Sequence, residues 1–194
     1  MSLNLDHLRR LSELFIADIK NSAYYANISE KQRKEFDEKI TEEKAQGFYP
    51  LLPGATEEEL ARLSKAVQQE SGIQLPNRVI EILRLVDGFA ENGVTLYGVD
   101  AEFRDDRFES GPGILAENHA KWSGYPETIG KYLFIGESDL WLFAIELSTG
   151  QATVLERSTL SLKHRFRTVN EMVNDMMHQA LSFLEVGEEA DALD

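Results

Sequence analysis

The stretch LPNRVIEILRLVDGFAENGVTLYG, residues 75–98, decides the fold that we expect for this chain. Pro76 suits the first turn of a helix, where its missing N–H costs no hydrogen bond. Apolar residues then recur at helical spacing and define one buried face: Leu75, Val79, Ile82, Leu83 and Val86. Gly88 can end this helix in the left-handed conformation, and Asn92-Gly93 is typical of a turn before a strand at 94–97. The stretch therefore predicts a helix, a glycine stop, a short loop and a strand.

A second helix is predicted directly upstream of this stretch. Thr56 and Glu59 have the spacing of a capping box, in which each side chain hydrogen-bonds the other residue's backbone at a helix N-terminus. Gly72 ends the helix, and its inward-facing residues are Leu60, Leu63 and Val67. We interpret this helix as scaffold.

Residues 1–50 are predicted to form a helical hairpin appended to the main domain. Apolar side chains repeat at helical spacing over residues 5–20, and Ser29 with Gln32 can cap a highly charged helix that follows. The connector 47–54 carries four bulky apolar residues, so we expect it to pack against the protein. The chain is then divided into three parts: the hairpin 1–50, a main domain 51–186 and an acidic, disordered tail 187–194.

An antiparallel sheet is predicted in the second half of the chain. An irregular segment, 100–130, with a short helix across 114–122, precedes it. Three strand patterns then follow one another: 131–136, 140–147 and 151–156. Thr168 and Glu171 can cap a final helix, whose methionines we interpret as core. The predicted fold is α+β, with an antiparallel sheet of four to six strands packed against helices.

The order of these elements resembles the opening of an SMI1/KNR4 domain of the SUKH superfamily. The likeness rests on PGATEEELARLSKAVQQESGIQLPNRVIEILRLVDGF, with its acidic helix, Gly-Ile-x-Leu-Pro joint and Asp-Gly helix end, followed by a Leu-Tyr-Gly strand. An Ile-Gly pattern with a later aromatic residue spans Ile135 to Phe143. The resemblance covers residues 52–184 and implies the same α+β arrangement. Bacterial proteins similar to this family are regarded as immunity proteins that block a cognate secreted toxin, and some eukaryotic relatives act through protein contacts in cell-wall signalling.

The charge of the chain constrains its partners. Thirty-four acidic residues against twenty basic ones give a formal net charge of −14 at pH 7. Such a field repels phosphate backbones, so we expect no nucleic-acid binding, whereas a basic protein would be attracted. The alternative is that net acidity only keeps the protein in solution.

The expected location is the cytoplasm, without membrane contact. The absence of cysteine fits a reducing compartment, and no apolar run is long enough to span a bilayer. The charged residues 1–20 do not have the pattern of a secretory signal.

Catalytic and cofactor motifs are not found in the sequence. It contains neither a phosphate-binding glycine loop nor a Gly-x-Ser-x-Gly nucleophile motif. The histidines do not lie at metal-ligand spacing from one another: His7, His119, His164 and His178. We therefore expect no enzyme activity, no cofactor and no metal.

Nine residues are the candidates for contact with a partner protein. They are an acidic loop, two aromatic residues and an acidic turn between strands: Asp100, Glu102, Asp105, Asp106, Glu109, Trp122, Tyr125, Glu137 and Asp139. For the acidic loop the alternatives are a solvated surface or a cation site, although Arg104 and Arg107 would partly neutralise such a site. The alternative for the aromatic residues is that they fill the core.

The function that we expect is that of an immunity protein. It would bind a cognate bacterial polymorphic toxin, a basic protein such as a nuclease, and neutralise it by occlusion. The resemblance and the acidity of the chain both favour this hypothesis. The alternative is a non-catalytic regulatory scaffold of the SMI1/KNR4 type, in which the hairpin 1–50 would dock a partner. The sequence predicts neither the identity of the toxin nor the oligomeric state.

Overall fold

An antiparallel sheet of six strands, in the order β1-β2-β3-β4-β5-β6, lies at the centre of the fold. The structure is a computed structural model that describes residues 2–45, 54–104 and 112–191. The strands are β1 Phe89–Glu91, β2 Val94–Leu96, β3 Tyr132–Ser138, β4 Trp141–Glu146, β5 Gln151–Glu156 and β6 Leu162–Phe166. The helices are α1 Leu5–Asn21, α2 Ala23–Asn27, α3 Glu30–Ala45, α4 Glu57–Ser71, α5 Asn77–Leu83, α6 Ile114–Gly124 and α7 Val169–Asp191, with short 3-10 helices η1 Ala101–Phe103 and η2 Pro126–Thr128.

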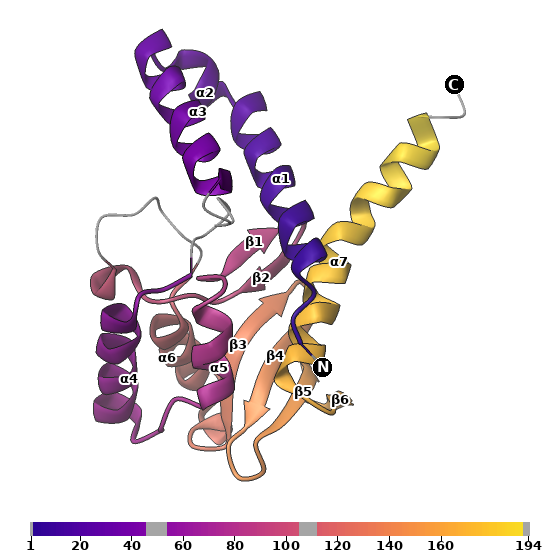
Figure 1. Cartoon of the computed structure of the whole chain (residues 1–194). Coiled ribbons are helices and arrows are strands. Elements are labelled where there is room, and N and C mark those ends of the chain that lie inside the picture. The colour runs from indigo at the N-terminus through magenta and orange to yellow at the C-terminus, as the bar shows by residue number, and fades with distance from the viewer. Residues whose placement is uncertain (1, 46–53, 105–111, 192–194) are drawn as a thin grey trace.

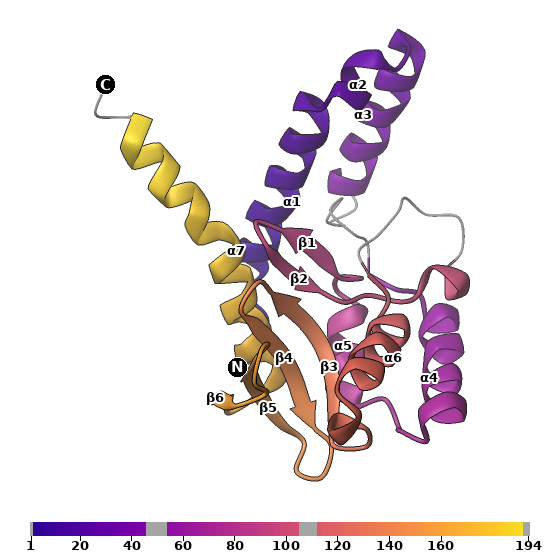
Figure 2. The ribbon, with the colours of Figure 1, turned by 180° about the vertical axis from the view of Figure 1, so that it is seen from behind.

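Helices cover the sheet on both faces (Figures 1 and 2). α7 packs on β2, β5 and β6 with α5 beside it, whereas α6 packs on β3 from the opposite face and contacts α4. The central strands are therefore buried from both sides, and their large side chains at most 1% exposed include Leu133, Phe134, Leu142, Phe143 and Leu155. This arrangement confirms the predicted α+β class and the antiparallel sheet.

The stretch 75–98 forms a helix and a β-hairpin, so the predicted helix and the strand at 94–97 are confirmed, whereas the prediction of a loop before that strand is wrong. α5 ends at Leu83, earlier than the apolar pattern indicates. Residues 89–91, predicted as loop, form β1, and Asn92 and Gly93 turn the chain into β2 with φ angles of 47° and 75°. Gly88 has a φ of 79°, but it begins the hairpin and does not end the helix. A Cβ atom on Gly88 would lie 2.7 Å from the carbonyl oxygen of Leu96, so the close approach of two backbones requires glycine here.

Local signals place most other elements where they are predicted. Thr56 and Glu59 form the capping box of α4, and Gly72 closes that helix with a φ of 71°. Ser29 and Gln32 hydrogen-bond each other at the start of α3. Strands β3, β4 and β5 lie within two residues of their predicted ranges. The methionines of α7 are fully buried in the core, as predicted: Met172, Met176 and Met177.

Three elements differ from the sequence prediction. α2 occupies residues 23–27, where we expected an irregular connection, and β6 adds a strand beyond the three predicted ones. α7 continues through residues 187–191, where we expected a disordered tail. Residues 46–53, which hold most of the connector that we expected to pack, lie outside the described residues.

α1 and the residues before it pack against α7, the C-terminal helix of the described chain. Its Leu8 and Leu11 are fully buried in the main core, and α7 is its principal partner (Figure 1). The backbone N–H of Asn4 donates to the side-chain oxygen of Asn174 at 2.7 Å, and the Asn174 amide donates to the Ser2 carbonyl at 3.0 Å. α1 is therefore integrated into the main domain.

α2 and α3 project away from the sheet (Figure 1). Lys20 of α1 lies 2.7 Å from the Asp37 carboxylate, and the Tyr25 hydroxyl donates to the same carboxylate at 3.1 Å. A surface groove of about 960 Å³ runs along α3, lined by Tyr25, Glu30, Arg33, Lys34, Asp37, Glu38, Thr41 and Glu42. These contacts hold the two helices as an arm, which we define as residues 23–45.

Glu91 makes the stability of the protein depend on pH. It is 9% exposed at the end of β1, and burial, followed by the charge of Asp18 on α1, raises its pKa from 4.5 to about 7. The neutral carboxyl is thus favoured in the folded state, so its stabilisation is complete below about pH 4.5 and is lost as the pH rises through 7. Glu91→Gln is expected to raise the melting temperature by about 3–5 °C at about pH 8 and to change it little in acid.

Thermal unfolding followed at several pH values would measure this effect. Asp18→Asn is the matched control, and it should give a smaller gain because burial is the larger cause of the raised pKa. Equal melting curves for Glu91→Gln and the parent protein at alkaline pH would contradict the assignment.

Candidate functional site

The order of the strands places three turns at one end of the sheet. In an antiparallel meander alternate turns lie at the same end, so the β1–β2, β3–β4 and β5–β6 turns lie together. We call residues 92–93, 139–140 and 157–161 the turn end. A Cβ atom on Gly93 would lie 3.9 Å from the Asp139 carboxylate, which makes the first two turns neighbours. Loops carried on a rigid sheet are a common location of binding residues.

Glu156 holds the β5–β6 turn in one conformation. Its carboxylate accepts hydrogen bonds from the Thr159 hydroxyl at 2.7 Å and the Ser161 hydroxyl at 3.0 Å, and Lys163 Nζ lies 3.2 Å away. These contacts, with Thr159 the largest cause, lower the pKa of Glu156. Leu160 has a φ of 56°, a conformation that persists in a residue with a side chain only where its surroundings fix it. These contacts within the turn favour the conformation that the turn has in the structure.

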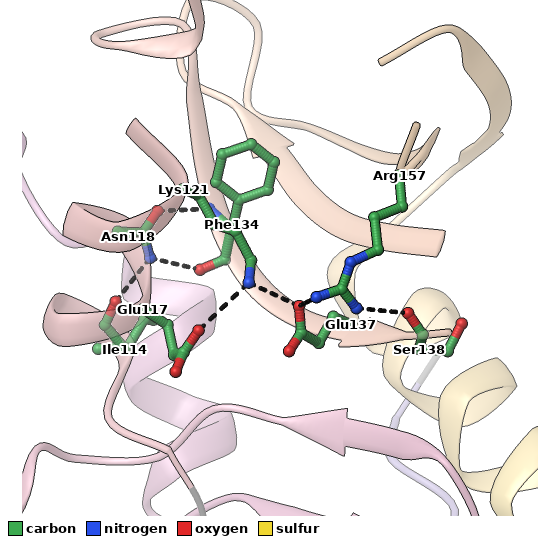
Figure 3. Close-up of polar contacts among 8 residues, drawn as sticks. All are labelled: Ile114, Glu117, Asn118, Lys121, Phe134, Glu137, Ser138 and Arg157. Carbon is green, nitrogen blue, oxygen red and sulfur yellow. Dashed lines mark hydrogen bonds and ion pairs between the residues drawn. The ribbon is translucent and has the colours of Figure 1, made fainter. Parts of the chain in front are cut away.

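Arg157 connects the turn end to Glu137 and Ser138 at the end of β3 (Figure 3). Its guanidinium lies 3.3 Å from the Glu137 carboxylate and donates to the Ser138 carbonyl at 3.1 Å. The carbonyl of Arg157 in turn accepts a hydrogen bond from the Tyr125 hydroxyl at 3.0 Å. The structure thus brings two of the predicted contact residues, Glu137 and Tyr125, to one arginine.

Two side chains of α6 attach that helix to β3 next to Arg157. Lys121 Nζ lies 2.7 Å from the Glu137 carboxylate and 3.3 Å from the Glu117 carboxylate (Figure 3). The Asn118 amide donates to the carbonyl of Phe134 at 2.7 Å and accepts from its N–H at 2.8 Å. Glu137 is 19% exposed and shared by two cations, so its charge is largely compensated before a partner could use it.

Tyr97, the tyrosine of the Leu-Tyr-Gly segment, is buried beside the ion pairs of Glu137 and Glu117. It is 1% exposed, and burial raises its pKa above the ordinary value, with the negative charges of Glu137 and Glu117 adding to the shift. The phenol is therefore neutral near pH 7. This position gives Tyr97 a role in packing α6 against the sheet and not in surface contact.

The exposed part of the turn end combines a carboxylate with an apolar side chain. Asp139 is exposed, and the next residue, Leu140, is 64% exposed. The carbonyl of Leu140 accepts a hydrogen bond from the backbone N–H of Arg157 at 2.9 Å, which fixes the backbone below the exposed side chain. The two side chains together offer an apolar group and a neighbouring charge, the two kinds of group that protein contacts combine in their centre and rim.

Two predicted contact residues are structural. Asp100 is 5% exposed, and its carboxylate accepts hydrogen bonds from the backbone N–H groups of Leu115 at 3.0 Å and Ala116 at 2.8 Å, in the first turn of α6. Trp122 is 6% exposed, and its indole N–H donates to the Tyr132 carbonyl at 3.1 Å. The polar groups of both residues are already used inside the fold, which favours a structural role over the predicted contact role.

Glu102, the exposed acidic residue in the described part of the acidic loop, does not join the turn end. Glu102 is exposed in η1, which packs beside α4, where Arg62 of α4 donates to the Phe103 carbonyl at 2.7 Å. Asp139 lies instead beside the β1–β2 turn. The remaining acidic candidates, Asp105, Asp106 and Glu109, lie outside the described residues.

Two residues of the turn end, Arg157 and Leu140, are not among those predicted from the sequence. Arg157 is a basic residue directly after a strand, which by itself indicates only a turn. Leu140 follows an exposed acid in a short turn, and an apolar residue at such a position is the signal that could have identified it. Within the described ranges, no group of three or more His, Asp or Glu side chains could hold a metal ion.

Comparison with known proteins does not assign the chain to a family. No protein-family model matches it, and no curated protein shows significant similarity to it. Among the helices of the described ranges, none has the length and apolar character needed to cross a membrane.

Proposed function

We propose that this chain binds another protein through the turn end, and that it is an immunity protein that covers a basic toxin. The turn end carries the proposal, because exposed Asp139 and Leu140 stand on a backbone that Arg157 and Glu156 hold in place. A surface that is ordered before binding loses little conformational entropy on contact. The net charge of −14 favours the approach of a basic partner. The assignment to toxin neutralisation rests on the resemblance of residues 52–184 to the SMI1/KNR4 family.

In this proposal the two exposed residues have different roles. Leu140 is the apolar anchor, which would be desolvated in the centre of the contact. Asp139 faces a basic side chain at the rim, where charge acts on the rate of association more than on the final affinity. The toxin would be blocked because its substrate cleft is covered.

Asp139→Lys is expected to slow association with a basic toxin domain about tenfold at low salt. The matched control is Glu127→Lys in η2, which changes the net charge equally at an exposed site near the opposite end of β3. Leu140→Ala should instead raise the dissociation rate about tenfold, because truncation removes an anchor without changing charge. Stopped-flow binding to an inactivated toxin encoded beside this gene would give both rates.

Two outcomes would contradict different parts of this proposal. If a toxin domain binds the parent protein and both turn-end variants equally well, the contact lies elsewhere and the immunity role survives. If no neighbouring toxin domain binds or is inhibited, the immunity role itself is rejected.

A regulatory scaffold is the second candidate, and the projecting arm favours it. α2 and α3 extend from the body (Figure 1), and Tyr24 on α2 is 65% exposed. Tyr24→Ala in the same binding assay tests whether the arm makes the toxin contact, whereas a regulatory role requires arm-dependent binding of a partner other than the toxin. Loss of binding in this variant, with unchanged binding of Leu140→Ala, would identify the arm as the contact.

A further inference from the structure

A basic segment of this acidic protein includes the last strand of the sheet. Residues 157–168 contain four Lys or Arg residues and no Asp or Glu, although the whole chain has a net charge of −14. β6 lies within this segment, and four of its five residues are exposed, with Phe166 half-buried. The charge distribution therefore marks β6 as a surface opposite in sign to the rest of the molecule.

The outer edge of β6 is available for backbone pairing. Within the part of the chain that the structure describes, β6 pairs with β5 and with no second strand, and it forms the margin of the sheet in Figure 2. An edge strand presents a row of N–H and C=O groups that can pair with another extended chain. Lysines on such an edge also discourage self-association, since two copies would bring like charges together.

The side chains of β6 would recognise acidic groups. Lys163 is paired with Glu156 at 3.2 Å, whereas in the described part of the chain no ion pair engages Arg165 or Arg167. His164 and Phe166 lie edge to face with their ring centroids 4.5 Å apart, which adds apolar area between the charges. This pattern suits a segment that alternates acidic and apolar side chains.

We propose that the outer edge of β6 binds an extended acidic segment of a partner protein, which adds a seventh strand to the sheet. Backbone hydrogen bonds supply affinity in this mode, and side chains supply specificity. The two arginines meet the acidic side chains of the incoming strand. A nucleic acid would match the charge but cannot continue the backbone ladder, and the net charge of −14 opposes its approach. The basic segment shares residues 157–161 with the turn end, but the contact proposed here is made by the edge of β6 and not by Asp139 and Leu140, and it does not depend on the toxin assignment.

The test uses the full chain and a labelled peptide of alternating Asp and Val, about eight residues long, in a fluorescence anisotropy titration. The expected dissociation constant is about 10–100 μM. The double variant Arg165→Gln/Arg167→Gln should weaken binding about tenfold. The matched control, Lys65→Gln/Lys131→Gln, removes two exposed positive charges outside β6 and should leave binding unchanged.

Two further probes separate strand addition from simple attraction of an anion. The same peptide with alternate backbone amides methylated cannot form the ladder, so it should bind at least about tenfold more weakly. The proposal would be overturned if the methylated peptide or a single-stranded oligothymidylate bound as tightly as the Asp–Val peptide. It would also be overturned if the two double variants lost peptide binding equally. Absence of binding by the Asp–Val peptide would also overturn it.

Discussion

Asp87→Ala is expected to destabilise the protein by about 3–5 kcal/mol and to lower its melting temperature by about 10 °C. The Asp87 carboxylate lies 3.0 Å from the Arg104 guanidinium, and the two side chains are 3% and 8% exposed. It also accepts a hydrogen bond from the backbone N–H of Val99 at 2.6 Å. Removal of the carboxylate breaks a buried ion pair and a buried backbone hydrogen bond together, which costs far more than the loss of an exposed pair.

Glu81→Ala provides the matched control for this prediction. Glu81 pairs with Arg78 at 2.6 Å, but both side chains are about half exposed or more, so the loss should be at most about 1 kcal/mol. Denaturant unfolding of both variants would measure the difference. Equal destabilisation by the two substitutions would show that burial of the Asp87–Arg104 pair does not set its contribution.

Gly136→Ala is expected to destabilise the protein by about 3 kcal/mol, because β3 has no room for a methyl group at this position. A Cβ atom there would lie 2.4 Å from the carbonyl oxygen of Thr95 and 2.4 Å from Met176 Cε. The methionine end can move, but the Thr95 carbonyl belongs to the paired strand β2 and cannot. Circular dichroism melts would give the change.

Gly124→Ala should have the opposite sign. A Cβ atom on Gly124, the last residue of α6, meets nothing within 4 Å, so alanine should stabilise the protein by about 0.5–1 kcal/mol through lower backbone entropy in the unfolded chain. Tolerance of Gly136→Ala with no loss of stability would contradict the assigned close contact.

The sequence predicts those elements whose ends are marked by capping residues or by a glycine. The Thr56–Glu59 capping box and Gly72 define α4 because these groups act within a few residues of each other. β1 was missed because its three residues, between Gly88 and the Asn92-Gly93 turn, are too few to show an alternation of apolar and polar side chains. β6 was missed because both its faces are exposed, so no apolar pattern marks it.

The candidate site could be predicted only in part. Exposure of an acidic or aromatic residue depends on contacts that are distant in sequence, so the burial of Asp100 and Trp122 could not be predicted: their partners are Leu115, Ala116 and Tyr132. The turn end requires the pairing order of six strands, which the sequence does not contain in local form. The carboxylate of Asp139 was identified because a short acidic turn between two strands is a local signal.

The packing of α1 on α7 has a consequence for biosynthesis. Ser2 and Asn4 contact Asn174, so these contacts join the start of the chain to its last helix. A growing chain on the ribosome exposes Leu8 and Leu11 from the beginning, yet α7 emerges only after every strand has been made. α1 is therefore synthesised before all six strands and before its principal partner α7, and during that interval its apolar face is open to chaperones.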